Sequence, residues 1–330
     1  QTLDRWKFYE STDGTYTTAQ TALSLADQAS TGGQTHALDI QVTGADTSIA
    51  TGQFAMVMQF VEAQNCQHLK FGTSSAVDLT LQFYVKSNLT GTTCGWISKE
   101  DSTFCQAPFE FTINSANTWE KKTVTIPSNA VVQASGSAIA NDNGVGIGVA
   151  FALALGGNFD NGTNLTWETG AASYCTGNQI NFMNSTSNDL FITGVQLEVG
   201  STATDFEHLP HDVQLQRCMR YTTVLSGTGG GNYGTLAPGY VTGSTQGFFT
   251  VVHPVPMRAA PSETTSADSD FVLADGSGSS IATTGIAVNQ GGADRTLILA
   301  TVSSGLTAGR GSAMLFNNKT TATLTLSAEI

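Results

Sequence analysis

Residues 77–85 read VDLTLQFYV, and the alternation of apolar and polar side chains in this stretch decides the fold class. The apolar residues at odd-numbered positions lie on one side of an extended chain, whereas Asp78, Thr80 and Gln82 lie on the other. A strand with one face in a core and one face toward water has this period of two. The segment therefore predicts a half-buried β-strand.

Strand patterns continue on both sides of this segment. Residues 109–113 (FEFTI) and 121–126 (KKTVTI) alternate in the same way, and the mostly apolar run at 54–61 is typical of a strand buried on both faces. Residues 145–155 (VGIGVAFALAL) alternate large side chains with Gly and Ala, which indicates that another surface packs closely against the small side. Roughly eight such strands precede residue 207, and they predict an all-β, two-sheet β-sandwich.

One segment, HDVQLQRCMRY at residues 211–221, breaks the strand pattern. Its apolar residues recur near helical spacing, and Pro210 stands where Pro often begins a helix. Short strand patterns then resume to the end of the chain. We therefore expect a β-sandwich domain over 1–206, a linker helix within 207–222, and a second, smaller C-terminal β-sandwich domain over 223–330.

Composition excludes several classes of protein. Of the 330 residues only 12% are charged, and 13 Lys and Arg against 26 Asp and Glu give a net charge of −13. A protein that binds nucleic acid needs a basic surface, and this chain has too few cations to form one. No run of 18 apolar residues occurs, so we expect no membrane insertion. Hydrophobic residues at 40% are enough for packed cores.

The five cysteines leave two interpretations open. Cys94 and Cys105 flank a polar stretch and could face each other across a hairpin as a disulfide. Alternatively, all five remain reduced and pack as small apolar side chains. No Cys and His spacing suggests a zinc site.

Histidine and acidic clusters give little sign of a metal or cofactor. His208 and His211 are three residues apart, but Pro210 between them disrupts the helical geometry that would bring them together, so we interpret the segment as a solvated linker. The turn around Asp142 is a weak candidate for structural calcium. We expect no cofactor.

The run ITGVQLEVGSTATDFEHLPHDVQLQRCMRY, residues 192–221, resembles a recurrent motif of bacteriophage virion proteins, both tail-fibre-like and capsid-associated. Asp205 departs from the motif, which often has Pro there. Five further segments are similar to the same family: LDRWK (3–7), LTLQFYVKSNLTG (79–91), ANTWEKKTVTIP (116–127), PVPMRAAP (254–261) and SAEI (327–330). The resemblance implies a leader before Gln1 and a location on the virion. It also implies a jelly-roll, carbohydrate-binding-module-like domain, and it carries no catalytic residues.

The loop at 156–170 is the best candidate for a glycan site. It combines Phe159 and Trp167 with Asn164 and Glu168, and sugars are bound by aromatic faces together with amide and carboxylate groups. Trp96, between Cys94 and Cys105, is a second candidate as a tryptophan at a loop tip. The structural alternative is that Trp167 packs against its own sandwich and the Asn residues form turns.

These observations favour a non-enzymatic fibre or spike subunit that binds host-surface glycan and contacts other virion proteins. We expect a homotrimer, with Leu215, Cys218 and Met219 as an interchain seam; the alternative is that this stripe packs between the two domains. A capsid decoration or connector protein without a ligand is the alternative function. A polysaccharide-degrading enzyme, using a carboxylate pair such as Glu168 and Asp189, is the third hypothesis.

Overall fold

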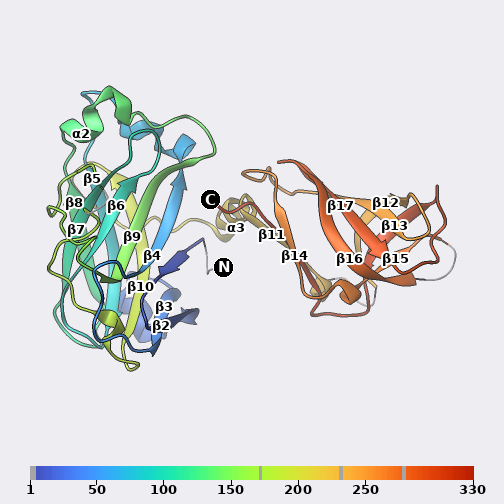
Figure 1. Ribbon diagram of the computed structural model, residues 1–330, viewed down its shortest axis with the longest axis horizontal. Helices are drawn as coiled ribbons and strands as arrows, with labels where there is room; N and C mark the ends of the chain where they lie inside the picture. The colour runs from blue at the N-terminus through green and yellow to red at the C-terminus, as the bar shows by residue number, and fades with distance from the viewer. Residues whose placement is uncertain (1–4, 171–172, 230–232, 277–279) are drawn as a thin grey trace. The chain divides into compact units, whose positions relative to one another are not determined.

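The computed structural model describes residues 5–170, 173–229, 233–276 and 280–330 (Figure 1). Leu3 and Asp4 of the N-terminal motif lie outside these ranges. The chain divides into two compact units, residues 1–208 and 209–329. Both units are built mainly from β-strands, which confirms the all-β fold class.

The N-terminal unit is a jelly-roll β-sandwich of two five-stranded antiparallel sheets. The first sheet has the strand order β1 (Lys7–Glu10), β4 (Phe54–Glu62), β9 (Val145–Leu155), β6 (Gly91–Lys99) and β7 (Cys105–Ile113). The second has the order β2 (Thr15–Ala22), β3 (His36–Gly44), β10 (Asp189–Val199), β5 (Leu79–Ser87) and β8 (Glu120–Ile126).

The core of this unit lies between the two sheets. Leu79, Leu81, Phe83 and Val85 of β5 are all buried in it, so the apolar side of 77–85 has the predicted orientation. The polar side is not open to water as expected, because Thr80 and Gln82 are also buried and donate hydrogen bonds to the carbonyls of Gly200 and Thr204, both at 2.7 Å. The Phe83 ring meets the Phe151 ring of β9 in the opposite sheet at 4.9 Å, with the two planes nearly perpendicular.

Short helices connect the strands. In the N-terminal unit they are α1 (Leu25–Ser30), η1 (Ala63–Leu69), α2 (Ala130–Gln133), η2 (Ser135–Ser137) and η3 (Phe182–Asn184). The C-terminal unit begins with α3 (His211–Met219), which lies inside the segment expected to be helical. Within the described ranges no helix combines the length and the apolar character needed to cross a bilayer.

The C-terminal unit corrects the expectation of a second sandwich. Its strands β12 (Thr235–Val241), β13 (Gln246–Val252), β17 (Arg295–Val302), β16 (Ser280–Gly291), β15 (Phe271–Ala274) and β18 (Gly311–Phe316) form a closed barrel. A separate three-stranded sheet contains β11 (Thr222–Ser226), β19 (Thr323–Ser327) and β14 (Ser262–Thr265). The barrel closes because β12 pairs with both β13 and β18, and strands in barrels and sandwiches show the same alternation.

Candidate functional site

Side chains on the outer face of the first sheet, on the side away from the core, are buried as well, among them Met58, Trp96 and Ala150. Along β9, Ile147, Val149 and Phe151 belong to the core, whereas Ala150 and Gly148 face outward. A Cβ atom on Gly148 would collide with the side chain of Met58. Met58 belongs to β4 of the same sheet, so this contact joins neighbouring strands. At Gly146 a separate element packs closely, because a Cβ atom there would lie 2.7 Å from the Ala63 backbone of η1, as predicted for the small side of this strand.

The loop between β9 and β10 lies over this outer face and is fastened to it. A disulfide joins Cys94 of β6 to Cys175 of the loop, across 81 residues of sequence. Gln106 of β7 and Glu168 of the loop exchange backbone hydrogen bonds of 2.9 and 2.8 Å. The loop is therefore held at both β6 and β7.

This disulfide shows that the pairing of Cys94 with Cys105 was wrong. In the β6–β7 hairpin Cys94 stands opposite Glu110, while Cys105 stands opposite Lys99. The two cysteines are therefore well separated along the ladder, and Cys105 points into the core. Burial raises the pKa of the Cys105 thiol to about 11, so it remains protonated.

Four half-buried aromatic rings follow one another across this region. We call Phe54, Phe159, Tyr174 and Phe104 the aromatic row, and none of them belongs to the core. Ring centroids lie 5.7 Å apart from Phe54 to Phe159, 6.2 Å from Phe159 to Tyr174, and 6.1 Å from Tyr174 to Phe104. Each ring thus keeps part of its surface accessible while its neighbours fix its position.

A carboxyl group and a second tyrosine lie near the row. Burial raises the pKa of Glu100, which follows β6 directly. Burial also raises the pKa of Tyr9 and of Tyr174, and the charge of Glu100 raises both further. Glu100 is therefore close enough for its charge to affect the pKa of both tyrosines. Their phenols stay protonated and can donate hydrogen bonds. Tyr9 is 38% exposed.

Both tryptophans expected to contact glycan are buried. Trp96 is 1% exposed because it lies inside β6, between β9 and β7, and not at a loop tip. The Tyr174 ring covers it at 5.2 Å, so Trp96 supports the aromatic row from beneath. Trp167 is also 1% exposed and packs in the core against Phe71 at 5.4 Å. The structural alternative for Trp167 is the correct one.

The other three predicted residues remain at the surface, but they do not come together. Phe159 belongs to the aromatic row, and its role in binding stays a prediction. The Asn164 side chain accepts a hydrogen bond from the backbone of Glu110 at 3.0 Å, and the Glu168 carboxylate accepts one from Thr163 at 3.3 Å. These two side chains hold the loop in place.

Three members of the row, Phe54, Phe104 and Tyr174, were not predicted from the sequence as binding residues. Phe54 and Phe104 carry no local signal, since one begins a strand and the other lies in a turn. Tyr174 had a usable one. It precedes Cys175, and a cysteine is a residue through which a long polar loop can be cross-linked, although its partner Cys94 is known only from the structure.

The structure offers no support for the proposed acid pair or for calcium. Glu168 is joined to β7 of the first sheet, whereas Asp189 begins β10 of the second and accepts a hydrogen bond from the backbone of Asn88 at 2.9 Å. Asp142 accepts a hydrogen bond from the backbone of Gly144 at 2.8 Å, as in a simple turn. Among the described residues no group of three or more His, Cys, Asp or Glu is arranged to hold a metal ion.

No protein-family model matches the sequence, and no curated protein matches it either. Several solved structures of carbohydrate-binding modules are similar to the chain. The family 11 module of the cellulosomal cellulase Lic26A-Cel5E of Clostridium thermocellum is 11% identical, over 62% of this chain and 92% of that one, with a TM-score of 0.32. A Clostridium thermocellum family 11 module in complex with a β-1,3-1,4-mixed-linked tetrasaccharide is 13% identical, over 62% and 94%, with a TM-score of 0.31. The module TmCBM61 in complex with β-1,4-galactotriose is 9% identical, over 59% and 89%, with a TM-score of 0.28.

Proposed function

We propose that the chain is a non-enzymatic, glycan-binding subunit of a bacteriophage virion, placed on a fibre or spike. The aromatic row carries the glycan-binding part of this proposal. Half-buried rings that follow one another can present apolar faces to the C–H groups of sugars. Their contacts with one another, edge-on from Phe54 to Phe159 to Tyr174 and tilted from Tyr174 to Phe104, hold the rings in position. Glu100 and Tyr9 beside the row supply acceptors and donors for sugar hydroxyls.

The virion part of the proposal is supported by the motif at 192–221 and the further segments that resemble phage virion proteins. A single sugar contact is weak, so several copies on one particle would raise the avidity by about 10²–10⁴-fold. We infer a homotrimer in which the apolar stripe of α3, formed by Leu215, Cys218 and Met219, is the interchain seam. Light scattering should then give three times the chain mass of 34.4 kDa. A mass of one chain would contradict the trimer.

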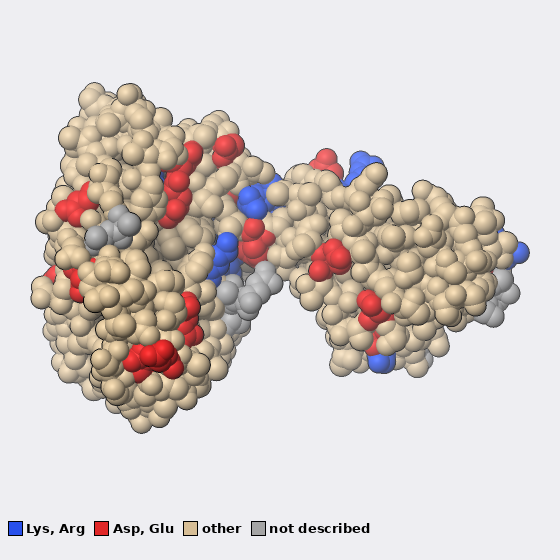
Figure 2. All heavy atoms as spheres, in the orientation of Figure 1, with Lys and Arg blue, Asp and Glu red and all other residues tan. Residues whose placement is uncertain are grey.

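Surface charge limits the choice of glycan. Uncharged side chains cover most of the surface visible in Figure 2, and acidic groups are scattered among them. The net charge of −13 repels anionic polymers, so neutral host-surface glycans fit best.

The test is binding of the full chain to an array of bacterial surface oligosaccharides. Tyr174→Ala should weaken binding by about tenfold or more, because it removes a central ring of the row. Tyr240→Ala is the matched control, since this tyrosine is 52% exposed in the C-terminal unit. Equal loss in both variants would contradict a site at the aromatic row.

Two other outcomes would favour the other hypotheses. If the chain binds no host glycan while gold-labelled antibodies still place it on assembled particles, it is a decoration or connector protein. If it releases reducing sugar from host polysaccharide, it is an enzyme. Failure of the antibodies to label any particle would contradict the virion location.

A further inference from the structure

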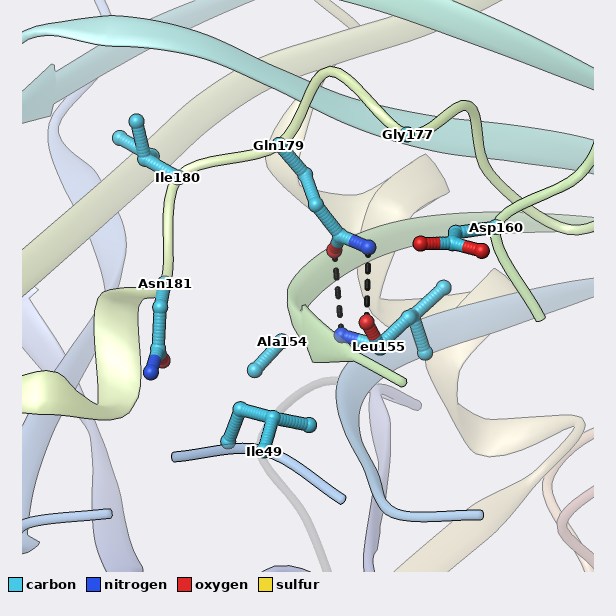
Figure 3. Close-up of a pocket in the computed structure, with 8 residues that line it drawn as sticks. All are labelled: Ile49, Ala154, Leu155, Asp160, Gly177, Gln179, Ile180 and Asn181. Carbon is cyan, nitrogen blue, oxygen red and sulfur yellow. Dashed lines mark hydrogen bonds between the residues drawn. The ribbon is translucent and has the colours of Figure 1, made fainter. Parts of the chain in front are cut away.

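A pocket opens at the end of β9 (Figure 3). Its volume is about 260 Å³. Sites that bury a drug-sized ligand measure about 300–1,000 Å³, so this pocket has room for one sugar residue and not for a longer glycan.

Two amide side chains in the pocket are fixed by backbone hydrogen bonds. Figure 3 shows Gln179 bound twice to Leu155: its side-chain oxygen accepts from the backbone N–H at 3.0 Å, and its amide nitrogen donates to the carbonyl at 2.8 Å. Asn181 donates to the carbonyl of Asp46 at 2.9 Å and accepts from the backbone of Met183 at 2.8 Å. The remaining hydrogen-bonding positions of both amides are therefore held in place before any ligand arrives.

Asp160 is a charged residue of the pocket wall. A backbone bridge to Ser173 fixes its position. Within the described ranges no side chain or backbone N–H donates a hydrogen bond to its carboxylate. A half-buried carboxylate without a donor is a strong acceptor for the hydroxyl groups of a ligand.

The pocket and the aromatic row are linked by residues that are neighbours in the sequence. Phe159 directly precedes Asp160, and Ser173, which bridges to Asp160, directly precedes Tyr174. The pocket residue Asp160 is therefore one residue along the chain from Phe159 and is paired with the residue next to Tyr174, so the pocket and the row share the same two backbone segments.

We propose that this pocket is a selectivity subsite that holds one neutral sugar residue, whose hydroxyls donate to Asp160, and that it excludes uronic acids. The inference rests on the proposed glycan-binding function. A uronate would bring a second carboxylate beside Asp160, and like charges at short range repel strongly where water is partly excluded. Among the described residues that line the pocket, none is a cation that would offset this repulsion.

The test uses matched oligosaccharide pairs whose end residue is glucose or glucuronate, galactose or galacturonate, and mannose or mannuronate. The full chain should bind the neutral member of its preferred pair about tenfold or more tightly than the acidic member. Asp160→Asn keeps the shape of the side chain and removes its charge, so the preference should fall to within about threefold. Asp205→Asn removes an exposed charge outside the pocket and should leave the preference unchanged.

The outcomes separate this inference from the proposed function. If the chain binds glycans and loses them in Tyr174→Ala, but Asp160→Asn keeps the full preference, the pocket is not the selectivity subsite. A preference for the acidic member would also overturn it. Binding to no member of any pair would overturn the glycan-binding function and this inference together.

Discussion

At the residue scale, Glu120 shows how one carboxylate can fasten a turn. It accepts hydrogen bonds from the backbone of Asn114 and Ser115, both at 2.8 Å, and from the Asn114 amide at 2.7 Å. The Lys122 ammonium donates to it at 2.6 Å. Burial opposes the charged form, but these bonds outweigh burial and lower the pKa of Glu120 to about 2.

This carboxylate should make stability depend on pH. Its pKa is lower in the folded chain than its ordinary value of 4.5, so its contribution is present above pH 4.5 and is lost as the pH falls toward 2. Glu120→Gln should lower the free energy of unfolding by about 1–3 kcal/mol at pH 7. It should also reduce the fall in the free energy of unfolding between pH 4.5 and pH 2. Urea unfolding at a series of pH values measures both effects. Glu263→Gln is the control, and an equal effect there would contradict the role of Glu120.

Gly95 belongs to the same scale, because its missing side chain permits close packing. A Cβ atom there would collide with the backbone carbonyl oxygen of Ala150 and lie 2.6 Å from the Phe109 ring. Gly95→Ala should therefore lower the free energy of unfolding by about 1–3 kcal/mol or more. Gly243 has open space around it, so Gly243→Ala should change stability little. Similar stability of both variants in urea would contradict this packing.

At the element scale, the disulfide fixes the long loop that carries the aromatic row. Cross-linking residues 81 apart restricts the unfolded chain, and removing the link should cost about 4 kcal/mol by chain entropy. The double variant Cys94→Ala, Cys175→Ala should therefore unfold at lower urea concentration and bind glycan more weakly, since Tyr174 adjoins the link. Cys66→Ala removes a buried thiol that takes no part in a disulfide and is the control.

Chemical labelling tests the pairing directly. Alkylation in denaturant without reductant should modify three of the five cysteines, and peptide mapping should recover the peptides of Cys94 and Cys175 cross-linked. Recovery of a cross-link between Cys94 and Cys105 would contradict the structure.

At the scale of the whole molecule, each unit has a hydrophobic core of its own. We expect fragments 1–208 and 209–330 to fold separately, with glycan binding retained by the first. Circular dichroism and urea unfolding of each fragment check this. A fragment without a cooperative transition would show that its unit depends on the rest of the chain.

The sequence by itself determined the properties that depend on neighbouring residues. Alternation at 77–85 set the buried face of β5, and the small residues of β9 predicted close packing on one side, because strand periodicity fixes which side chains share a face. The helical spacing after Pro210 likewise located α3.

Only the tertiary structure decided which distant residues meet. Trp96 is buried because β6 is an inner strand and Tyr174, far along the chain, covers it. Cys94 pairs with Cys175, and the C-terminal strands close into a barrel, although local patterns allowed a hairpin disulfide and a second sandwich. The aromatic row likewise draws its rings from β4, the β6–β7 turn and the long loop. These contacts depend on strand order and on where the loops lie, which are set by hydrogen bonds and packing between residues far apart in the sequence. No short stretch of sequence is therefore enough to predict them.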